Sequence, residues 1–169
     1  MPVAEPVDLR DRDRLLLDRH RLLDLVGLLA RLVLGAVLVV AGLLKVTSPA
    51  SSALAVRAYQ LLPYDVAGVV GHALPVVEIA VGLLLVLGLF TRAAAVVGGL
   101  LMVAFLIGII SAWARGLSID CGCFGGGGTI AAAQTHYLSE TLRDVGLALC
   151  AGWLVLRPRT ALSLDRRLF

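Results

Sequence analysis

The sequence predicts an all-α membrane protein, a four-transmembrane-helix antiparallel bundle with both termini in the cytoplasm. Of the 169 residues, 59% are hydrophobic and only 16% are charged, and the mean hydropathy is +0.94. These values lie outside the range of soluble globular chains. Four apolar stretches are each near the ~20 residues that span a bilayer as a helix. Because lipid offers no water to hydrogen-bond the backbone, these stretches are expected to be helices, and short connections make neighbouring helices antiparallel. The stretches are Leu25–Leu44, Val66–Phe90, Ala93–Trp113 and Tyr137–Leu156.

The first stretch follows residues 1–24, in which Arg and Asp alternate before pairs and triplets of Leu. We expect this segment to be a charged helix that lies at the cytoplasmic surface or extends the first span, with a partner-docking site as the alternative. A cleaved signal peptide is disfavoured, because the apolar run is too long and the small-x-small site Ala53-Leu54-Ala55 lies well beyond its end. The domain proper is therefore expected at 25–156.

Positive charges predict the orientation of this domain in the plasma membrane. Ten arginines precede the first helix, lie in the second connection or occupy the tail 157–169, and four basic residues lie on the other side. The positive-inside rule then puts both termini in the cytoplasm and the first and third connections outside. The ten are Arg10, Arg12, Arg14, Arg19, Arg21, Arg92, Arg157, Arg159, Arg166 and Arg167, and the four are Lys45, Arg57, Arg115 and Arg143.

The two outer connections are the longer ones. Residues 47–65 contain Ser48-Pro49, which is typical of a helix start and predicts a short interfacial helix with tyrosine anchors. Residues 115–140 contain Cys121-Gly122-Cys123-Phe124-Gly125 within a run of glycines that permits sharp turns. We expect the two connections to meet over the bundle.

Two thiols one residue apart on a polar loop predict exchange chemistry, because such thiols can ionise and swap bonds with a partner. A disulfide across one residue closes a small strained ring, which favours passing oxidation on to other thiols. The alternatives are a structural disulfide and a zinc or copper site made by Cys121, Cys123 and His136. Cys150, in the fourth helix, is expected to be a buried small apolar residue.

Ionisable residues inside the bundle need partners, since an unpaired charge near the membrane centre costs at least ~2.5–3.5 kcal/mol. Counting residues from the helix ends puts Arg31 and Glu78 at one depth, and we predict an ion pair between them. The same count puts His72 and Asp144 at one depth beneath the cysteines.

Lys45 and Arg143 lie close to that layer. Together with His72 and Asp144, these residues predict either a proton relay for the dithiol or a polar network that fixes helix packing. Pro75 frees a backbone carbonyl nearby, which predicts either a packing kink or a pocket for a quinone or thiol ligand.

Together these features resemble the MauE branch of the DoxX-like membrane proteins, over roughly residues 25–156. The Cys-Gly-Cys-Phe-Gly string in this setting is the most specific part of the resemblance. It implies a four-helix polytopic protein linked to extracytoplasmic thiol chemistry, in a family named for maturing the disulfide-rich subunit of methylamine dehydrogenase. The other matching residues are Arg31, Gly35, Gly42-Leu43-Leu44-Lys45, Tyr59-Gln60-Leu61-Leu62-Pro63, Leu74-Pro75-Val76-Val77-Glu78, Arg115-Gly116 and Arg143-Asp144.

The function expected is extracytoplasmic thiol-disulfide exchange or electron transfer through Cys121 and Cys123, for the maturation of a secreted or membrane partner. A thiol-disulfide oxidoreductase would need an electron carrier, and a membrane quinone or another thiol protein are the candidates. The alternative is a non-enzymatic accessory or scaffold subunit with a structural or metal-bound Cys pair. Nucleic-acid binding is disfavoured, because the net charge is only +3 and aromatic residues make up 5% of the chain.

Overall fold

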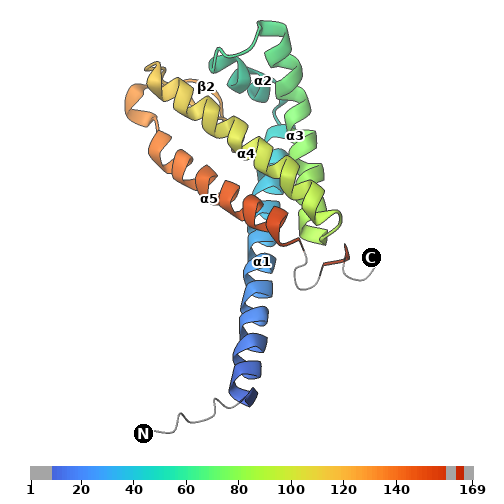
Figure 1. Cartoon of the computed structure of the whole chain (residues 1–169). Helices are drawn as coiled ribbons and strands as arrows, with labels where there is room; N and C mark the ends of the chain where they lie inside the picture. The colour runs from blue at the N-terminus through green and yellow to red at the C-terminus, as the bar shows by residue number, and fades with distance from the viewer. Residues whose placement is uncertain (1–8, 159–162, 166–169) are drawn as a thin grey trace, which may run out of the picture.

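The computed structural model describes residues 9–158 and 163–165, with side chains from residue 21 onward except at position 133. Within these residues the chain is mostly helical, and five α-helices and a short two-stranded sheet follow one another (Figure 1). The helices are α1 (Leu9–Val46), α2 (Pro49–Ala58), α3 (Tyr64–Leu87), α4 (Thr91–Ala114) and α5 (Tyr137–Leu156). The third connection contains β1 (Ile119–Asp120), β2 (Gly128–Thr129) and the 3-10 turn η1 (Ala132–Gln134).

The predicted interfacial helix is present as α2, with Pro49 at its start, where the missing N–H of proline costs no hydrogen bond. The predicted bounds of α5 are confirmed. The charged amino-terminal segment extends the first span, which is one of the two predicted arrangements: α1 is one continuous helix from Leu9 that runs well past the other helices (Figure 1).

In the described part of the chain, three helices are long and apolar enough to cross a membrane: Arg21–Val46, Tyr64–Leu87 and Thr91–Ala114. The first two turns of α5 hold Glu140, Arg143 and Asp144, so its apolar part is shorter. The chain is thus a helical membrane protein with three candidate spans, and a fourth span through α5 stays a prediction.

Glycines let α1 and α3 pack backbone to backbone as antiparallel neighbours. A Cβ atom added at Gly82 of α3 would lie 2.7 Å from the carbonyl oxygen of Gly35 in α1. One added at Gly42 would lie 2.8 Å from the carbonyl oxygen of Pro75. Such small-residue contacts are typical of helix pairs in membranes, where close van der Waals packing replaces the hydrophobic effect.

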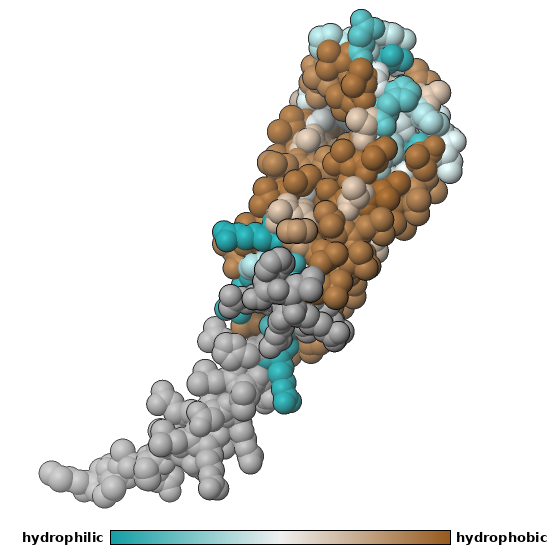
Figure 2. Space-filling model, turned by 90° about the vertical axis from the view of Figure 1, so that its right-hand side faces the viewer, coloured by the Kyte–Doolittle hydropathy of each residue, from teal (hydrophilic) through white to brown (hydrophobic). Residues whose placement is uncertain are grey.

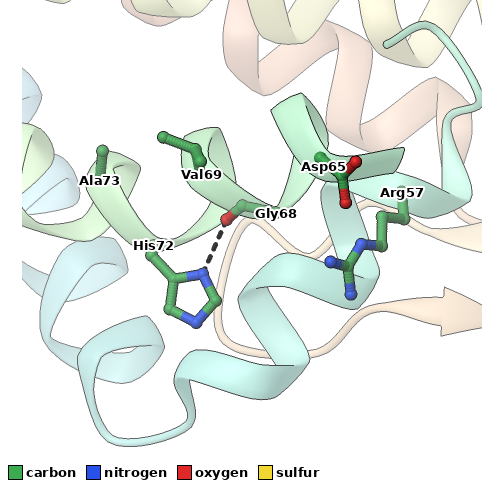
Figure 3. Close-up of a pocket in the computed structure, with 6 residues that line it drawn as sticks. All are labelled: Arg57, Asp65, Gly68, Val69, His72 and Ala73. Carbon is green, nitrogen blue, oxygen red and sulfur yellow. Dashed lines mark hydrogen bonds between the residues drawn. The ribbon is translucent and has the colours of Figure 1, made fainter. Parts of the chain in front are cut away.

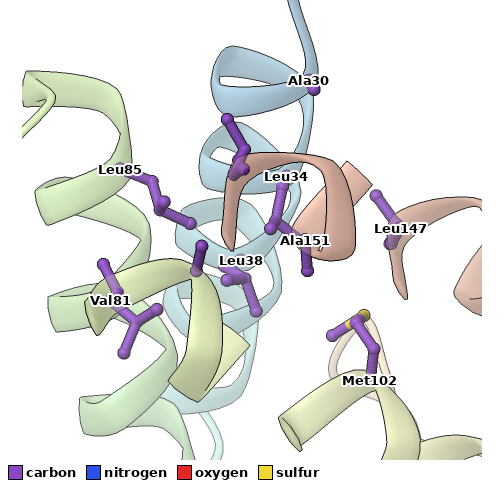
Figure 4. Packing of buried hydrophobic residues seen from close by; sticks show 11 residues of the cluster. Ala30, Leu34, Leu38, Val81, Leu85, Met102, Leu147 and Ala151 are labelled. Atoms are coloured by element: carbon purple, nitrogen blue, oxygen red, sulfur yellow. The ribbon is translucent and has the colours of Figure 1, made fainter. Parts of the chain in front are cut away.

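One apolar core joins α1, α3, α4 and α5 (Figure 4). Leu34, Leu38 and Leu85 are almost fully buried there, and Ala151 of α5 packs among them. Cys150 is half-buried and packs against this core, as predicted for a small apolar residue.

The outer surface of the bundle is also apolar, as expected where the surrounding solvent is lipid. Val69, Leu100 and Leu149 are 70%, 64% and 71% exposed. Figure 2 shows a hydrophobic body with hydrophilic residues gathered at its two ends. Exposed apolar area on this scale marks a membrane surface.

The carboxyl-terminal segment lies at the turn between α3 and α4. The Asp165 N–H donates to the carbonyl of Gly88, and the Asp165 carboxylate accepts from the N–H groups of Phe90 and Thr91 at 2.8 Å each. Residues from the amino-terminal half of α1 and the end of α5 also line one surface pocket. Both ends of the domain therefore lie on the face opposite the cysteine loop.

The predicted Arg31–Glu78 ion pair is wrong. Arg31 is buried beside Gly88, at the end of α3, and interacts electrostatically with Asp165. Gly88 is ten residues from Glu78, a separation of ~15 Å along a helix. The depth count fails because it measures the depth of Arg31 from Leu25, taken as the start of the first span. In the structure Arg31 lies level with the end of α3, and not level with Glu78 in the middle of that helix.

Candidate functional site

The cysteine loop rests on α2, so the first and third connections do meet over the bundle. The hairpin pairs Ile119 with Thr129 and Asp120 with Gly128. In the loop that joins its two strands, Cβ atoms added at Gly122 or Gly127 would overlap Ala55 of α2. The absence of side chains at these two glycines therefore allows the loop to lie directly on the helix.

Three aromatic and basic side chains hold the loop in this position. The Tyr59 hydroxyl, at the end of α2, donates to the carbonyl of Cys121 at 3.0 Å. Burial, followed by the nearby cysteines, raises the pKa of Tyr59, so the hydroxyl stays a donor. Arg115 donates to the carbonyl of Tyr59, and the Tyr137 hydroxyl donates to Leu117 at 2.6 Å.

The turn between the cysteines brings the two thiols together. Gly122 has φ +67°, a conformation that L side chains rarely adopt. Its N–H donates to Asp120 Oδ1 at 2.9 Å, and the Cys123 N–H donates to Cys121 Sγ at 3.4 Å. Both cysteines are free thiols, linked by a side-chain hydrogen bond.

The two thiols differ in exposure and in acidity. Cys123 is only 8% exposed, whereas Cys121 is half-buried. The hydrogen bond from Cys121, aided by Arg143 and Lys45, holds the pKa of Cys123 below its usual value despite burial. The same hydrogen bond, together with burial, raises the pKa of Cys121. Cys123 is therefore the better thiolate and Cys121 the more accessible sulfur.

Two ion pairs lie beneath Cys123. Lys45 Nζ is 2.5 Å from Glu78 Oε1, and Arg143 Nε is 2.8 Å from Asp144 Oδ1. A cavity of about 20 Å³, lined among others by Cys123 and both carboxylates, separates the pairs. Glu78 Oε2 and Asp144 Oδ2 are buried and accept no hydrogen bond from any described residue. These two oxygens are therefore unpartnered polar atoms next to the dithiol.

His72 does not join this group. It is exposed on α3, where its Nδ1 lies 2.7 Å from the carbonyl of Gly68, and it lines a surface pocket with Arg57 and Asp65 (Figure 3). Of the four polar residues expected beneath the cysteines, the structure brings Lys45, Arg143 and Asp144 near Cys123 and leaves His72 on the surface. The proposed relay through His72 has no geometric support.

The alternative metal site is not assembled either. His136 is exposed at the start of α5. Among the residues that the structure describes, no three His, Cys, Asp or Glu side chains lie close enough to hold a metal ion.

A second, larger cavity of about 340 Å³ reaches the cysteines from the side of the bundle. Its lining is mainly apolar and comes from α2, α3 and α4, with Lys45, Tyr59 and both cysteines contributing the polar and reactive atoms. Phe105 forms part of its wall, and the Lys45 ammonium lies 5.2 Å from the centre of that ring.

Sequence reasoning missed the roles of three aromatic residues at this site. The sequence indicates Tyr59 as a membrane anchor and as part of the family resemblance but not as a partner of Cys121, although its place in the connection that meets the cysteine loop is a usable signal. Phe124 follows the cysteines directly and stacks under the Arg143 guanidinium at 5.0 Å. Phe105 had no signal, because it is one apolar residue among many in α4.

Comparison with known proteins agrees with this architecture. A family model described as Methylamine utilisation protein MauE matches residues 23–157. Searches of curated proteins and of solved structures found no match. The match covers α1 from residue 23 onward, all of α3, α4 and α5, and the first and third connections, including the Cys pair.

Proposed function

The chain belongs to the MauE family, and on this premise we propose that it carries out thiol-disulfide exchange through Cys121 and Cys123 on the extracytoplasmic side of the plasma membrane. The observation that carries the proposal is the unequal thiol pair. One sulfur is accessible, the other is acidic, and they are linked by a hydrogen bond above two buried ion pairs. A structural disulfide needs no such difference.

The difference assigns a role to each sulfur. In the disulfide state, a thiolate of the client attacks Cys121, the accessible sulfur, and the Cys121–Cys123 bond breaks. Cys123 leaves as the thiolate, which a lowered pKa favours. A second client thiolate then attacks the client sulfur of the mixed disulfide and releases Cys121. The client loses two electrons and two protons, and the Cys pair gains the two electrons.

Two carboxylates near the Cys pair can hold the protons that the exchange moves. Glu78 Oε2 and Asp144 Oδ2 are buried acceptors around the small cavity beside Cys123. A proton that the pair takes up or releases can be held there, while Lys45 and Arg143 balance the charge of the Cys123 thiolate. This replaces the predicted relay through His72 by one made of the two carboxylates.

The location rests on charge and on topology. The cysteine loop lies on the face of the bundle opposite both ends of the described domain, and most arginines of the sequence occur near the two termini. The positive-inside rule then favours an outward-facing Cys pair, where disulfides persist. The partner is a secreted or membrane protein with thiols to oxidise.

The test is to trap the mixed disulfide in cells that make the full chain. Cys123→Ser should accumulate a covalent adduct on Cys121: the Cys121 thiolate attacks a client disulfide and releases one client thiol, and the mixed disulfide persists because Cys123, which would attack it, is missing. Cys121→Ser should accumulate less, since Cys123 is buried, and Cys150→Ser should behave like the wild type. Non-reducing gels and mass spectrometry identify the adduct.

The rival function, an accessory scaffold, predicts a different result. Both Cys→Ser variants would then be free of adducts, and the native partner complex would keep its yield. Modification of Cys121 and Cys123 only from the cytoplasmic side of intact cells would also overturn the proposal.

A further inference from the structure

The larger cavity points to the electron acceptor of the Cys pair. Its volume of about 340 Å³ falls in the lower part of the ~300–1,000 Å³ range of small-molecule sites. That space suits a single ring with a short substituent. It does not suit a folded client.

The entrance of this cavity faces lipid. Leu61, Leu62 and Val70 line it and are 49%, 43% and 37% exposed, and Ala104 of α4 is exposed as well. All four are apolar, so a ligand that enters between them comes from the hydrocarbon and not from water.

The inner end of the cavity is polar and reactive. Cys121 and Cys123 form part of its wall, and Lys45 and Tyr59 line it too. Lys45 has three N–H groups and gives one to Glu78, so others can be donated to a carbonyl oxygen. An apolar ring with oxygen atoms at its edge matches this combination.

We propose that this cavity binds the ring of an isoprenoid quinone, which re-oxidises the Cys121–Cys123 dithiol. The inference rests on the proposed thiol exchange, because that reaction leaves the pair reduced. In the balanced step, the two sulfurs lose two electrons and two protons and form one S–S bond. The quinone gains them at its two oxygens and leaves as the quinol. The lipid-facing entrance lets both forms exchange with the bilayer pool.

The test uses the purified full chain in lipid nanodiscs, fully reduced and freed of reductant. A benzoquinone with one isoprene unit is added without oxygen, and the quinone absorbance and the thiol count are followed together. We expect one quinol for each disulfide formed. Ala104→Trp and Val70→Trp, which fill the entrance from two different helices, should slow the reaction about tenfold or more.

The matched control is Ala80→Trp, an exposed alanine on α3 that does not line the cavity. It should react within about twofold of the wild type. Exchange with glutathione disulfide, which needs the sulfurs but not the entrance, should be unchanged in all three variants and reports that they are folded.

The outcomes separate the two proposals. If the wild type exchanges with glutathione disulfide but is not oxidised by the quinone, the quinone site is wrong and the thiol exchange stands. The same holds if both entrance variants react at the wild-type rate. If the wild type does neither reaction, the proposed function fails as well.

Discussion

Lys45 Nζ lies 2.5 Å from Glu78 Oε1, and their side chains are 4% and 0% exposed. The pair joins the end of α1 to the middle of α3 beneath the cysteine loop. Removing one partner of a buried ion pair leaves an uncompensated charge, so Lys45→Met should lower the free energy of unfolding by about 3–5 kcal/mol. Reversible unfolding in mixed detergent micelles measures this change.

The double variant Lys45→Met, Glu78→Gln provides the control. With both charges gone, most of the lost stability should return, because apolar replacement of a whole buried pair is often close to neutral. If Lys45→Met alone were as stable as the wild type, the prediction would be wrong, and Glu78 would have to be neutral or neutralised by another group.

The acidity of Cys123 gives a second prediction. Its pKa is lowered first by the hydrogen bond from Cys121 and then by Arg143. In Arg143→Gln the pKa of Cys123 should rise, so less thiolate is present at neutral pH. The alkylation rate of Cys123 at pH 7 should therefore fall, since a higher pKa lowers the thiolate fraction.

The measurement is the pH profile of iodoacetamide labelling, read at Cys123 by mass spectrometry in the Cys121→Ser background, where a hydroxyl keeps a donor near the sulfur. Arg57→Gln is the matched control, because that guanidinium stacks on Tyr64 and does not act on Cys123. If the pH profile of Cys123 labelling shifted equally in Arg143→Gln and Arg57→Gln, the charge of Arg143 would not be acting locally on Cys123.

These pairings show how far the sequence leads. Hydropathy predicts the helices, and Ser48-Pro49 predicts α2, because length and local turn chemistry determine both. The partner of Glu78 was beyond reach, since counting depth assumes that neighbouring helices end at one level, and α1 runs past the end of α3. The long side chain of Lys45 also reaches about a turn down from its own backbone.

His72 illustrates a second limit. In a helix that is apolar all round, hydropathy does not separate the buried face from the lipid face. The depth of His72 along α3 could therefore be predicted, but the direction of its side chain could not. In the structure the side chain is exposed on the outside of the bundle. Glu78 and Asp144 point inward because burial beside a cation is the way to stabilise a charge in lipid.

The close contact of α1 with α3 gives a third prediction. A Cβ at Gly82 would lie 2.7 Å from the carbonyl oxygen of Gly35, so Gly82→Ala forces the helices apart. We expect a loss of about 1–3 kcal/mol, as in other overpacked interiors. Gly152→Ala in α5, with open space around it, should instead be neutral or stabilising by up to about 1 kcal/mol. Similar losses in both variants would contradict the proposed packing.

The Asp165 carboxylate supplies a cap for α4 from a distant part of the chain. Phe90, at the start of α4, makes no side-chain cap, and Asp165 accepts from the Phe90 and Thr91 N–H groups instead. Asp165→Ala should cost about 0.5–2 kcal/mol, the range for the loss of a helix cap. Hydrogen exchange in the first turn of α4 measures the change, and unchanged protection would rule out the cap.

The same contact predicts a response to acid. Burial raises the pKa of Asp165, but the hydrogen bonds from Thr91 and Phe90 and the charge of Arg31 outweigh it, and the pKa is lowered. The contribution is therefore present above the ordinary pKa of an aspartate and is lost as pH falls through the lowered value. Protection of the first turn of α4 should decline over that acidic range in the wild type and not in Asp165→Ala.

Two glycines of the third connection offer a matched pair for the cysteine site. Gly122 and Gly116 have nearly the same backbone, with φ +67° and +66°, but a Cβ at Gly122 would overlap Ala55 while one at Gly116 meets nothing within 4 Å. Both Gly→Ala variants bear the strain of a left-handed residue, about 1–2 kcal/mol. Only Gly122→Ala also lifts the loop from α2.

We therefore expect Gly122→Ala to expose Cys123 and to raise its labelling by a bulky maleimide several-fold, whereas Gly116→Ala leaves labelling at the wild-type level. The double variant Gly122→Ala, Ala55→Gly restores the space that the new methyl needs, and it should return the labelling of Cys123 toward the wild type. Rescue by this second-site change is the decisive readout, because backbone strain alone would persist in the double variant. Labelling that stayed high would show that the loop is held by its turn and not by its contact with α2.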